Sequence, residues 1–388
     1  MKLLSLCLLS TVFLGTVNSA MAENSDKVNI WNWSYNIGEH TVADFEKDTG
    51  LKTSYVEYDS NELQEARLLA GNTGFDAAVV VSYYVPRMAK SGALQKIDHS
   101  KIPNWVKLNH ARLEKMATLD PNNDYAYPYI EISIGIGYNK QKIEEIFGKD
   151  YKIDSWDFLF KKENSDKLKK CGIAVIDSPI EVISAVQHYL SKDPLSQKAE
   201  DYEEAKKILT NLAANTAYFQ SNRYVTDLAS GEICAAIGYS GDIIQGRHLA
   251  AHGKHKYDIE YVIPKEGSIF WYDSWTVPRG AKNYDNAMKW FDWLLTPENA
   301  RKLSDELGYV LPVDEAMDNL SEELKSNDSI MLSDEKLKTM YFMQPTPAKT
   351  TKITNRVWNA MKTDSSKIKS SDVTEDDANG NCLDCEFF

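Results

Sequence analysis

The sequence predicts an α/β protein with two units, each built around a mainly parallel sheet flanked by helices. Three observations support this prediction. The chain has 388 residues, which is enough for two hydrophobic cores. Between Val28 and Val81, apolar strand-like segments alternate with amphipathic helix-like segments in a β-α-β-α-β order, which is typical of parallel sheets. The same alternation returns between residues 154 and 261.

The first unit begins with five alternating elements. Strands and helices are expected at residues 28–33, 41–50, 52–57, 62–70 and 75–81. Gly50 should end the first helix, because glycine readily adopts the left-handed conformation found at helix ends. The last of these segments is continuously apolar, as expected of a strand buried on both faces. Ligands of such sheets bind at the carboxyl ends of strands, here residues 33–36 and 82–84.

Further elements follow along the chain. Residues 133–139 are apolar and glycine-bearing, and we interpret them as a strand that leaves the first unit. They form no dinucleotide-binding motif, because the third glycine and the following helix start are missing. Another strand is expected at 272–277 and a helix at 283–295, and Thr296-Pro297 should cap and begin the next helix. From Thr363 onward the chain is rich in Ser, Asp and Glu, which predicts a mostly disordered tail.

The net charge excludes some partners. The chain has 44 Lys plus Arg and 57 Asp plus Glu, which gives a formal charge of −13. Without a basic surplus, nucleic acid and anionic lipid are not expected as partners. An acidic protein suits cationic ligands, although a solvated acidic surface explains the same charge.

The N-terminus is typical of an exported protein. Lys2 precedes the apolar run Leu3–Leu14, and Ala20-Met21-Ala22 has the small-residue pattern of a cleavage site. We therefore predict a signal peptide at residues 1–22 and a soluble mature chain in an exported, oxidising space. No other segment approaches the roughly 18 apolar residues of a membrane helix.

Four cysteines remain after residue 22: Cys171, Cys234, Cys382 and Cys385. An even number in an exported chain favours disulfides, and three pairings are open. The two tail cysteines are close enough to pair only locally, which leaves Cys171 with Cys234. A zinc site in the tail would need two more ligands nearby, and the tail has no His.

The sequence contains no recognisable catalytic or cofactor motif. It lacks a nucleophile elbow, a phosphate-binding loop and the His-Glu-x-x-His pattern of metalloproteases. His248, His252 and His255 have helical spacing, but Gly253 interrupts them, which favours a solvated helix end over a metal site. We therefore expect no metal, no cofactor and no enzymatic activity.

Aromatic residues stand beside acids and hydroxyl residues at the expected strand ends. Aromatic faces pack on alkyl chains and attract ammonium groups, and carboxylates pair with ammonium groups. The alternative is that these aromatics belong to the core and the acids are solvated. The segments are Trp33-Ser34-Tyr35, Ser82-Tyr83-Tyr84, Gly238-Tyr239-Ser240-Gly241-Asp242 and Phe270-Trp271-Tyr272-Asp273-Ser274-Trp275.

Several motifs in a fixed order resemble one family over residues 28–362. They are Asn32-Trp33-Ser34, Thr73-Gly74-Phe75-Asp76, Pro128-Tyr129, Gly135-Ile136-Gly137-Tyr138-Asn139, Ser155-Trp156-Asp157 and Ala236-Ile237-Gly238-Tyr239-Ser240-Gly241-Asp242. Together they resemble the periplasmic polyamine-binding proteins of ABC transporters, particularly the putrescine-binding branch. The resemblance implies two α/β lobes that close on the ligand like a clamshell, and a disulfide between Cys171 and Cys234. It divides the chain into a signal peptide, lobe 1 at 27–133 plus 274–307, lobe 2 at 134–273 plus 308–362, and a tail at 363–388.

The resemblance also implies a set of ligand-binding residues. Tyr35 stands where the family has an acid, and Asn36 stands where it has Tyr. Val81 and Tyr83 replace serines of the putrescine branch. The missing acid predicts weaker putrescine binding. The implied ligand-binding residues are Trp33, Ser34, Tyr35, Tyr83, Tyr84, Glu181, Ser221, Tyr239, Asp242, Trp271, Asp273 and Tyr309.

These observations predict a monomeric, non-enzymatic solute-binding protein that captures a polyamine for uptake by an inner-membrane ABC permease. One alternative is a periplasmic protein that senses polyamines and regulates a membrane signalling receptor. Another is a binding protein for another amine or for an amino acid. An amino acid ligand needs an arginine for its carboxylate, and Arg223 is the candidate. An exported hydrolase or lyase needs a nucleophile with a base in the cleft, and none is evident.

Overall fold

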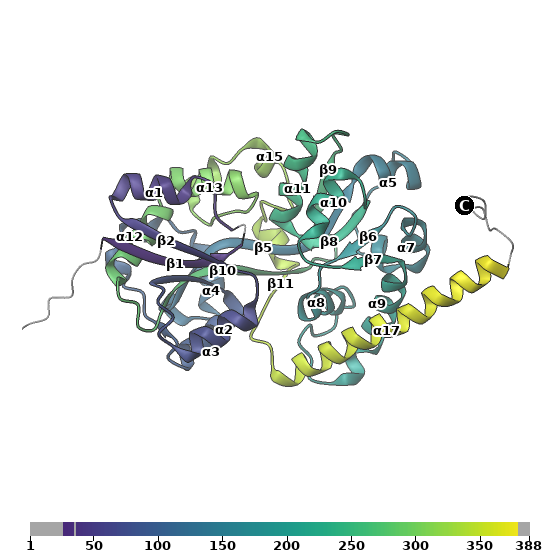
Figure 1. Ribbon diagram of the computed structural model, residues 1–388, viewed down its shortest axis with the longest axis horizontal. Coiled ribbons are helices and arrows are strands. Elements are labelled where there is room, and N and C mark those ends of the chain that lie inside the picture. The colour runs from purple at the N-terminus through teal and green to yellow at the C-terminus, as the bar shows by residue number, and fades with distance from the viewer. Residues whose placement is uncertain (1–25, 35, 379–388) are drawn as a thin grey trace, which may run out of the picture.

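The computed structural model describes residues 26–34 and 36–378 (Figure 1). The predicted signal peptide, Tyr35, Cys382 and Cys385 lie outside the described residues. Two lobes lie side by side in Figure 1, each with helices on both sides of a sheet. The predicted two-lobed α/β fold is therefore confirmed.

The first lobe contains the predicted β-α-β-α-β unit. Its strands are β1 (Lys27–Trp33), β2 (Lys52–Tyr58) and β3 (Ala77–Val81), which are parallel in the order β2-β1-β3. Helices α1 (Thr41–Thr49) and α2 (Asn61–Ala70) connect them. Gly50 ends α1 with φ 73°, and its N–H donates to the carbonyl of Glu46. This conformation is the one that the glycine predicted.

The second lobe repeats this arrangement. Its parallel strands are β6 (Ile173–Val175), β7 (Thr216–Phe219) and β8 (Ala235–Tyr239), in the order β8-β6-β7. Strand β9 (Ile259–Val262) pairs only at the edge, with β5.

Two long strands join the lobes. They are β5 (Ala126–Asn139) and β10 (Ile269–Pro278), which pair antiparallel with each other. β10 also pairs antiparallel with β3 of the first lobe. β5 pairs with β10 as far as Ser133, and from Ile134 it pairs with β8 of the second lobe. The strand predicted to leave the first unit is thus the second half of β5.

The remaining α-helices flank the sheets, and two further short strands pair with β10. They are α3 (Val85–Lys90), β4 (Leu94–Gln95), α4 (His110–Ala117), α5 (Lys140–Phe147), α6 (Asp157–Phe160), α7 (Lys162–Leu168), α8 (Pro179–Tyr189), α9 (Glu203–Asn215), α10 (Arg223–Ser230), α11 (Ser240–His252), α12 (Tyr284–Leu294), α13 (Pro297–Leu307), α14 (Asp314–Asp318), α15 (Glu322–Lys325), α16 (Asp334–Lys338), β11 (Tyr341–Phe342) and α17 (Ala348–Ala378). Thr296 occupies the N-cap of α13, but its side chain makes no capping hydrogen bond.

The disorder predicted from Thr363 onward is wrong for residues 363–378. Helix α17 continues to Ala378 and packs against α9 and α8 of the second lobe (Figure 1). Asp364 of α17 forms an ion pair with Lys206 of α9 at 3.0 Å, and Ser365 is buried. Disorder was predicted from the polar composition alone, and composition carries no information about the surface of the second lobe on which α17 packs. Residues 379–388 lie outside the described part of the chain.

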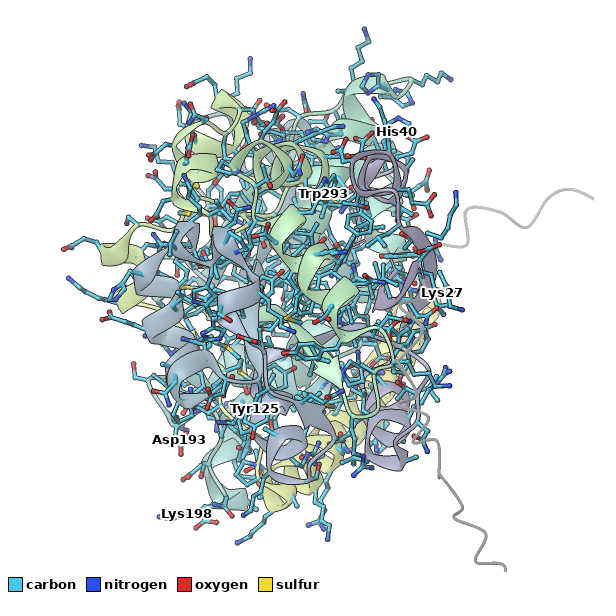
Figure 2. The ribbon with its side chains drawn as sticks, turned by 90° about the vertical axis from the view of Figure 1, so that its left-hand side faces the viewer. Lys27, His40, Tyr125, Asp193, Lys198 and Trp293 are labelled. Atoms are coloured by element: carbon cyan, nitrogen blue, oxygen red, sulfur yellow. A yellow bond between two sulfur atoms is a disulfide. The ribbon has the colours of Figure 1, made fainter. Side chains whose placement is uncertain are left out.

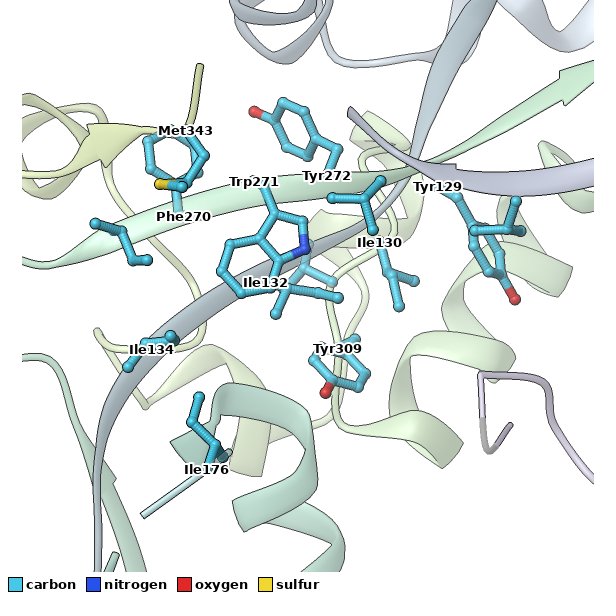
Figure 3. Close-up of a cluster of buried hydrophobic side chains, with 14 of the residues drawn as sticks. Tyr129, Ile130, Ile132, Ile134, Ile176, Phe270, Trp271, Tyr272, Tyr309 and Met343 are labelled. Carbon is cyan, nitrogen blue, oxygen red and sulfur yellow. The ribbon is translucent and has the colours of Figure 1, made fainter. Parts of the chain in front are cut away.

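Side chains of β10 alternate between the two faces of the sheet. Figure 3 shows Tyr272 on one face, and Trp271 on the other, where Ile132 and Tyr309 also lie. Charged side chains cover the outside of the molecule, for example Asp193 and Lys198 at its lower edge in Figure 2. Among the described residues, no helix is long and apolar enough to cross a bilayer.

Candidate ligand-binding site

Most of the described residues that were predicted to bind a ligand lie where the two lobes meet. They come from the ends of parallel strands, the starts of the helices that follow, and strand β10. Trp33 ends β1, Tyr83 and Tyr84 follow β3, and Tyr239 ends β8. Glu181 lies in the first turn of α8 and Asp242 in the first turn of α11. The topology therefore places these side chains at the edge where ligands of parallel sheets bind.

Glu181 is held by one phenol from each lobe. The hydroxyl of Tyr83, from the first lobe, donates to Oε1 at 3.1 Å. The hydroxyl of Tyr239, from the second lobe, donates to Oε2 at 2.9 Å. The Glu181 side chain is buried, so both bonds are shielded from water. The bond from Tyr83 connects the two lobes directly.

Asp242 is also held by two phenols. The hydroxyl of Tyr224 donates to Oδ2 at 2.7 Å and that of Tyr309 donates to Oδ1 at 2.9 Å. Burial raises the pKa of Asp242, and the two phenol hydrogen bonds act in the opposite direction. The sequence predicted Tyr309 but missed Tyr224, which is fully buried at the start of α10.

Asp273 is the least compensated acid of the site. Its side chain on β10 is 2% exposed, and Oδ2 accepts one hydrogen bond from Asn36 Nδ2 at 2.9 Å. Oδ1 is buried without a hydrogen-bond partner among the described residues. Burial, followed by the nearby charge of Glu181, raises the pKa of Asp273 to about 8. No Lys, Arg or His in the described part of the chain forms an ion pair with Asp242 or Asp273.

Asn36 contacts the Asp273 carboxyl, and the sequence identified it only as a departure from the family. Besides its bond to Asp273, its carbonyl accepts hydrogen bonds from Tyr129 Oη at 2.8 Å and Asn32 Nδ2 at 2.9 Å. Asn36 is therefore fixed from both sides and orients the Asp273 carboxyl.

The aromatic side chains form two groups. The ring of Trp271 lies edge-on to Tyr239 at 5.9 Å and to Tyr83 at 6.2 Å between centroids. Trp33 instead packs on Tyr58 of β2 at 4.4 Å, a contact that the sequence did not predict. The Trp33 Nε1 atom is buried without a hydrogen-bond partner among the described residues.

Tyr84 is half-buried and lies next to Tyr83, with 5.2 Å between ring centroids. The Arg87 guanidinium lies 5.3 Å from the centroid of the Tyr84 ring. This ring therefore already contacts a cation of the protein.

Both predicted serines bond to the backbone. Ser34 Oγ donates to the carbonyl of Tyr58 at 3.4 Å, and Ser221 Oγ accepts from the N–H of Asp177 at 3.1 Å. Arg223, the candidate for carboxylate binding, forms an ion pair with Asp227 at 2.8 Å. The placement of Tyr35 lies outside the described residues.

The disulfide between Cys171 and Cys234 is present, with a Cα–Cα distance of 5.5 Å. It joins the segments just before β6 and β8, two neighbouring strands of the second lobe. Within residues 26–34 and 36–378, no group of three His, Cys, Asp or Glu is arranged to hold a metal ion.

Comparison with known proteins finds a matching family and relatives that are described as binding proteins. Residues 40–331 match the family described as bacterial extracellular solute-binding protein. The chain is 37% identical to the putrescine-binding periplasmic protein SpuD of Pseudomonas aeruginosa, over 93% of this chain and 99% of that protein. It is 38% identical to the putrescine-binding periplasmic protein PotF of Escherichia coli, over 91% of this chain and 95% of that one.

A solved structure from Listeria monocytogenes, described as a putative spermidine/putrescine ABC transporter, superposes with a TM-score of 0.75 at 28% identity. The superposition covers 87% of this chain and 99% of the Listeria monocytogenes chain. The two-lobed fold, the acids between the lobes and these matches lead to one assignment. The chain belongs to the family of bacterial extracellular solute-binding proteins.

Proposed function

We propose that this protein captures a polyamine between its two lobes, in the periplasm, for uptake by an ABC permease. The observation that supports this most directly is Asp273. A buried carboxyl with one unpaired oxygen, and with a second acid close by, is unfavourable unless a cation compensates it. An ammonium group that donates to Oδ1 would pair with the charge and stabilise the ionised form.

The arrangement of the other groups suits a flexible dication or trication. Asp242 and Glu181 offer further carboxylates, and the ring of Trp271 lies beside Tyr83 and Tyr239. Aromatic faces pack on a methylene chain and attract its ammonium ends. In this proposal Asp273 binds one ammonium group, Asp242 with Glu181 bind another, and the rings enclose the chain between them.

The phenols on Glu181 affect the choice of ligand. Tyr83 and Tyr239 already satisfy both of its oxygens, so an ammonium group at Glu181 has to share them or displace a phenol. Asp242 is held by two phenols in the same way, so among these three acids Asp273 offers the oxygen that an ammonium group reaches without this competition. The named relatives bind putrescine, and we propose putrescine, spermidine or a related polyamine as the ligand here.

Lobe closure is the proposed means of capture. We propose lobes at 27–133 plus 274–307 and at 134–273 plus 308–362, because β5 changes its neighbours between Ser133 and Ile134. A ligand that contacts both lobes favours the closed conformation by its differential affinity. The closed monomer then presents a surface that the permease recognises.

Titration calorimetry of ligand-stripped protein tests this proposal. The panel consists of putrescine, spermidine and norspermidine, with 1,4-butanediol as a control of the same length as putrescine but without charge. We expect at least one polyamine to bind and the diol not to bind. Absence of heat with all three amines, or equal binding of the diol, would refute the proposal.

A further inference from the structure

The long C-terminal helix contacts the loop that leads to Glu181. This loop, residues 176–178, lies between strand β6 and helix α8. In it, Asp177 Oδ1 accepts hydrogen bonds from Trp358 Nε1 at 2.9 Å and from Lys362 Nζ at 2.8 Å. The two donors are one turn apart on α17, and both bind the same oxygen.

The two donors are themselves fixed by aromatic packing. Trp358 is 3% exposed, and Phe219 at the end of β7 lies edge-on to it with 5.3 Å between centroids. Lys362 Nζ lies 4.8 Å from the centroid of Phe219 and 5.2 Å from that of Trp358. The ammonium group thus lies between two ring faces and a carboxylate, which restricts its position.

The opposite side of the loop is attached to the sheet and to Ser221. The N–H of Asp177 donates to Ser221 Oγ at 3.1 Å, and the N–H of Ile176 donates to the carbonyl of Ile237 at 3.2 Å. The loop is therefore held from both sides. Because Glu181 follows only four residues after Asp177, in the first turn of α8, the loop sets where its carboxylate lies.

We propose that Trp358 and Lys362 are positioning residues for ligand binding. They hold Asp177, and through the loop they place the Glu181 carboxylate where Tyr83, Tyr239 and an ammonium group can reach it. This inference rests on the proposed function, and it extends the binding apparatus to a helix outside the site described above. A purely structural role of α17 would stabilise the fold without acting through Glu181.

Variants at Lys362 and Trp358 separate these two roles. Lys362→Met removes the ammonium group, Lys362→Arg keeps a donor, and Trp358→Phe keeps a ring but removes the N–H. The matched control is Lys206→Met, which breaks the ion pair between Lys206 of α9 and Asp364 of α17. The side chains of this pair are 33% and 37% exposed, and those of Lys362 and Asp177 are similarly exposed, at 34% and 46%. We expect polyamine affinity to fall about twofold to fivefold in Lys362→Met and in Trp358→Phe. Lys362→Arg should recover the affinity, and the control should keep it.

A double-variant cycle and hydrogen exchange complete the test. In a Glu181→Gln background, Lys362→Met should cause no further loss of affinity, whereas a structural role would give an additive loss. In ligand-free protein, the backbone amides of residues 177, 178, 180 and 181 should exchange faster in Lys362→Met than in wild type or Lys206→Met. Additive affinity losses, or unchanged exchange in that loop, would overturn the inference. If the wild type binds no polyamine, the proposed function fails, and the exchange measurement still decides the positioning role.

Discussion

Asp273 gives the sharpest prediction about stability, because its carboxyl is buried with one oxygen unpaired. Its pKa is raised from an ordinary 3.8 to about 8 in the folded protein. Between these two values the unfolded chain releases the proton while the folded chain keeps it. The free energy of unfolding therefore falls as the pH rises, by at most about 1.4 kcal/mol per pH unit, and levels off above pH 8. The total loss is on the order of 5 kcal/mol at pH 8.

Asp273→Asn should remove this pH dependence in the ligand-free protein. The amide can still accept from Asn36, and its NH₂ group takes the place of the oxygen that has no partner. In urea unfolding at pH 5, 6, 7 and 8, the variant should become progressively more stable relative to wild type as the pH rises. Parallel stability profiles of the two proteins would refute the reasoning.

Asp76→Asn is the matched control for a buried acid. Asp76 is 1% exposed, but both of its oxygens accept hydrogen bonds, among them one from the N–H of Asn29 at 2.8 Å and one from the N–H of Asn283 at 2.8 Å. An amide cannot accept at its NH₂ side, so this variant should lose about 1–3 kcal/mol of stability at pH 8. At pH 8, Asp273→Asn should therefore raise the free energy of unfolding and Asp76→Asn should lower it.

Asp242→Asn should weaken polyamine binding by about 2–5 kcal/mol in calorimetry, because it removes a charge partner from a desolvated ammonium group; unchanged affinity would exclude Asp242 from the site. Tyr83→Phe removes the hydroxyl that connects the lobes, so the ligand-free protein should open and its radius of gyration in small-angle scattering should increase. An unchanged radius would show that this bond does not hold the lobes together. Replacing Cys171 and Cys234 by Ser should lower the free energy of unfolding by about 4 kcal/mol, and equal stability in urea would contradict this. Truncation after Ser366 should leave polyamine affinity unchanged, since the Asp177 contacts of α17 lie before that residue; loss of binding would contradict it.

Local patterns predicted most of the secondary structure. The strands β1 to β3 and the helices between them follow from hydrophobic periodicity and from Gly50, which are properties of neighbouring residues. The end of the chain was mispredicted because the stability of α17 depends on α9, which lies more than a hundred residues earlier in the sequence. A composition-based argument takes no account of such a partner.

The acids of the site could be proposed from their places at strand ends and from the family resemblance. Their hydrogen-bond partners could not. Asn36 and Asp273 are 237 residues apart, and Tyr83 and Glu181 are 98 apart. Tyr224 is close to Asp242 in sequence, at a separation of 18, but nothing in its local pattern distinguishes it from an ordinary core tyrosine. These contacts exist only after the chain has folded.

The position of β10 in the first sheet has a consequence for the kinetics of folding. This strand lies between β3 and β5, and Thr276 Oγ1 donates to the carbonyl of Ala78, which is 198 residues earlier. The edge of β3 therefore stays unpaired until nearly three-quarters of the chain is available. Long-range pairing of this kind slows folding. For a chain exported N-terminus first, as proposed here, slow completion of the first lobe keeps the polypeptide unfolded while it crosses the membrane.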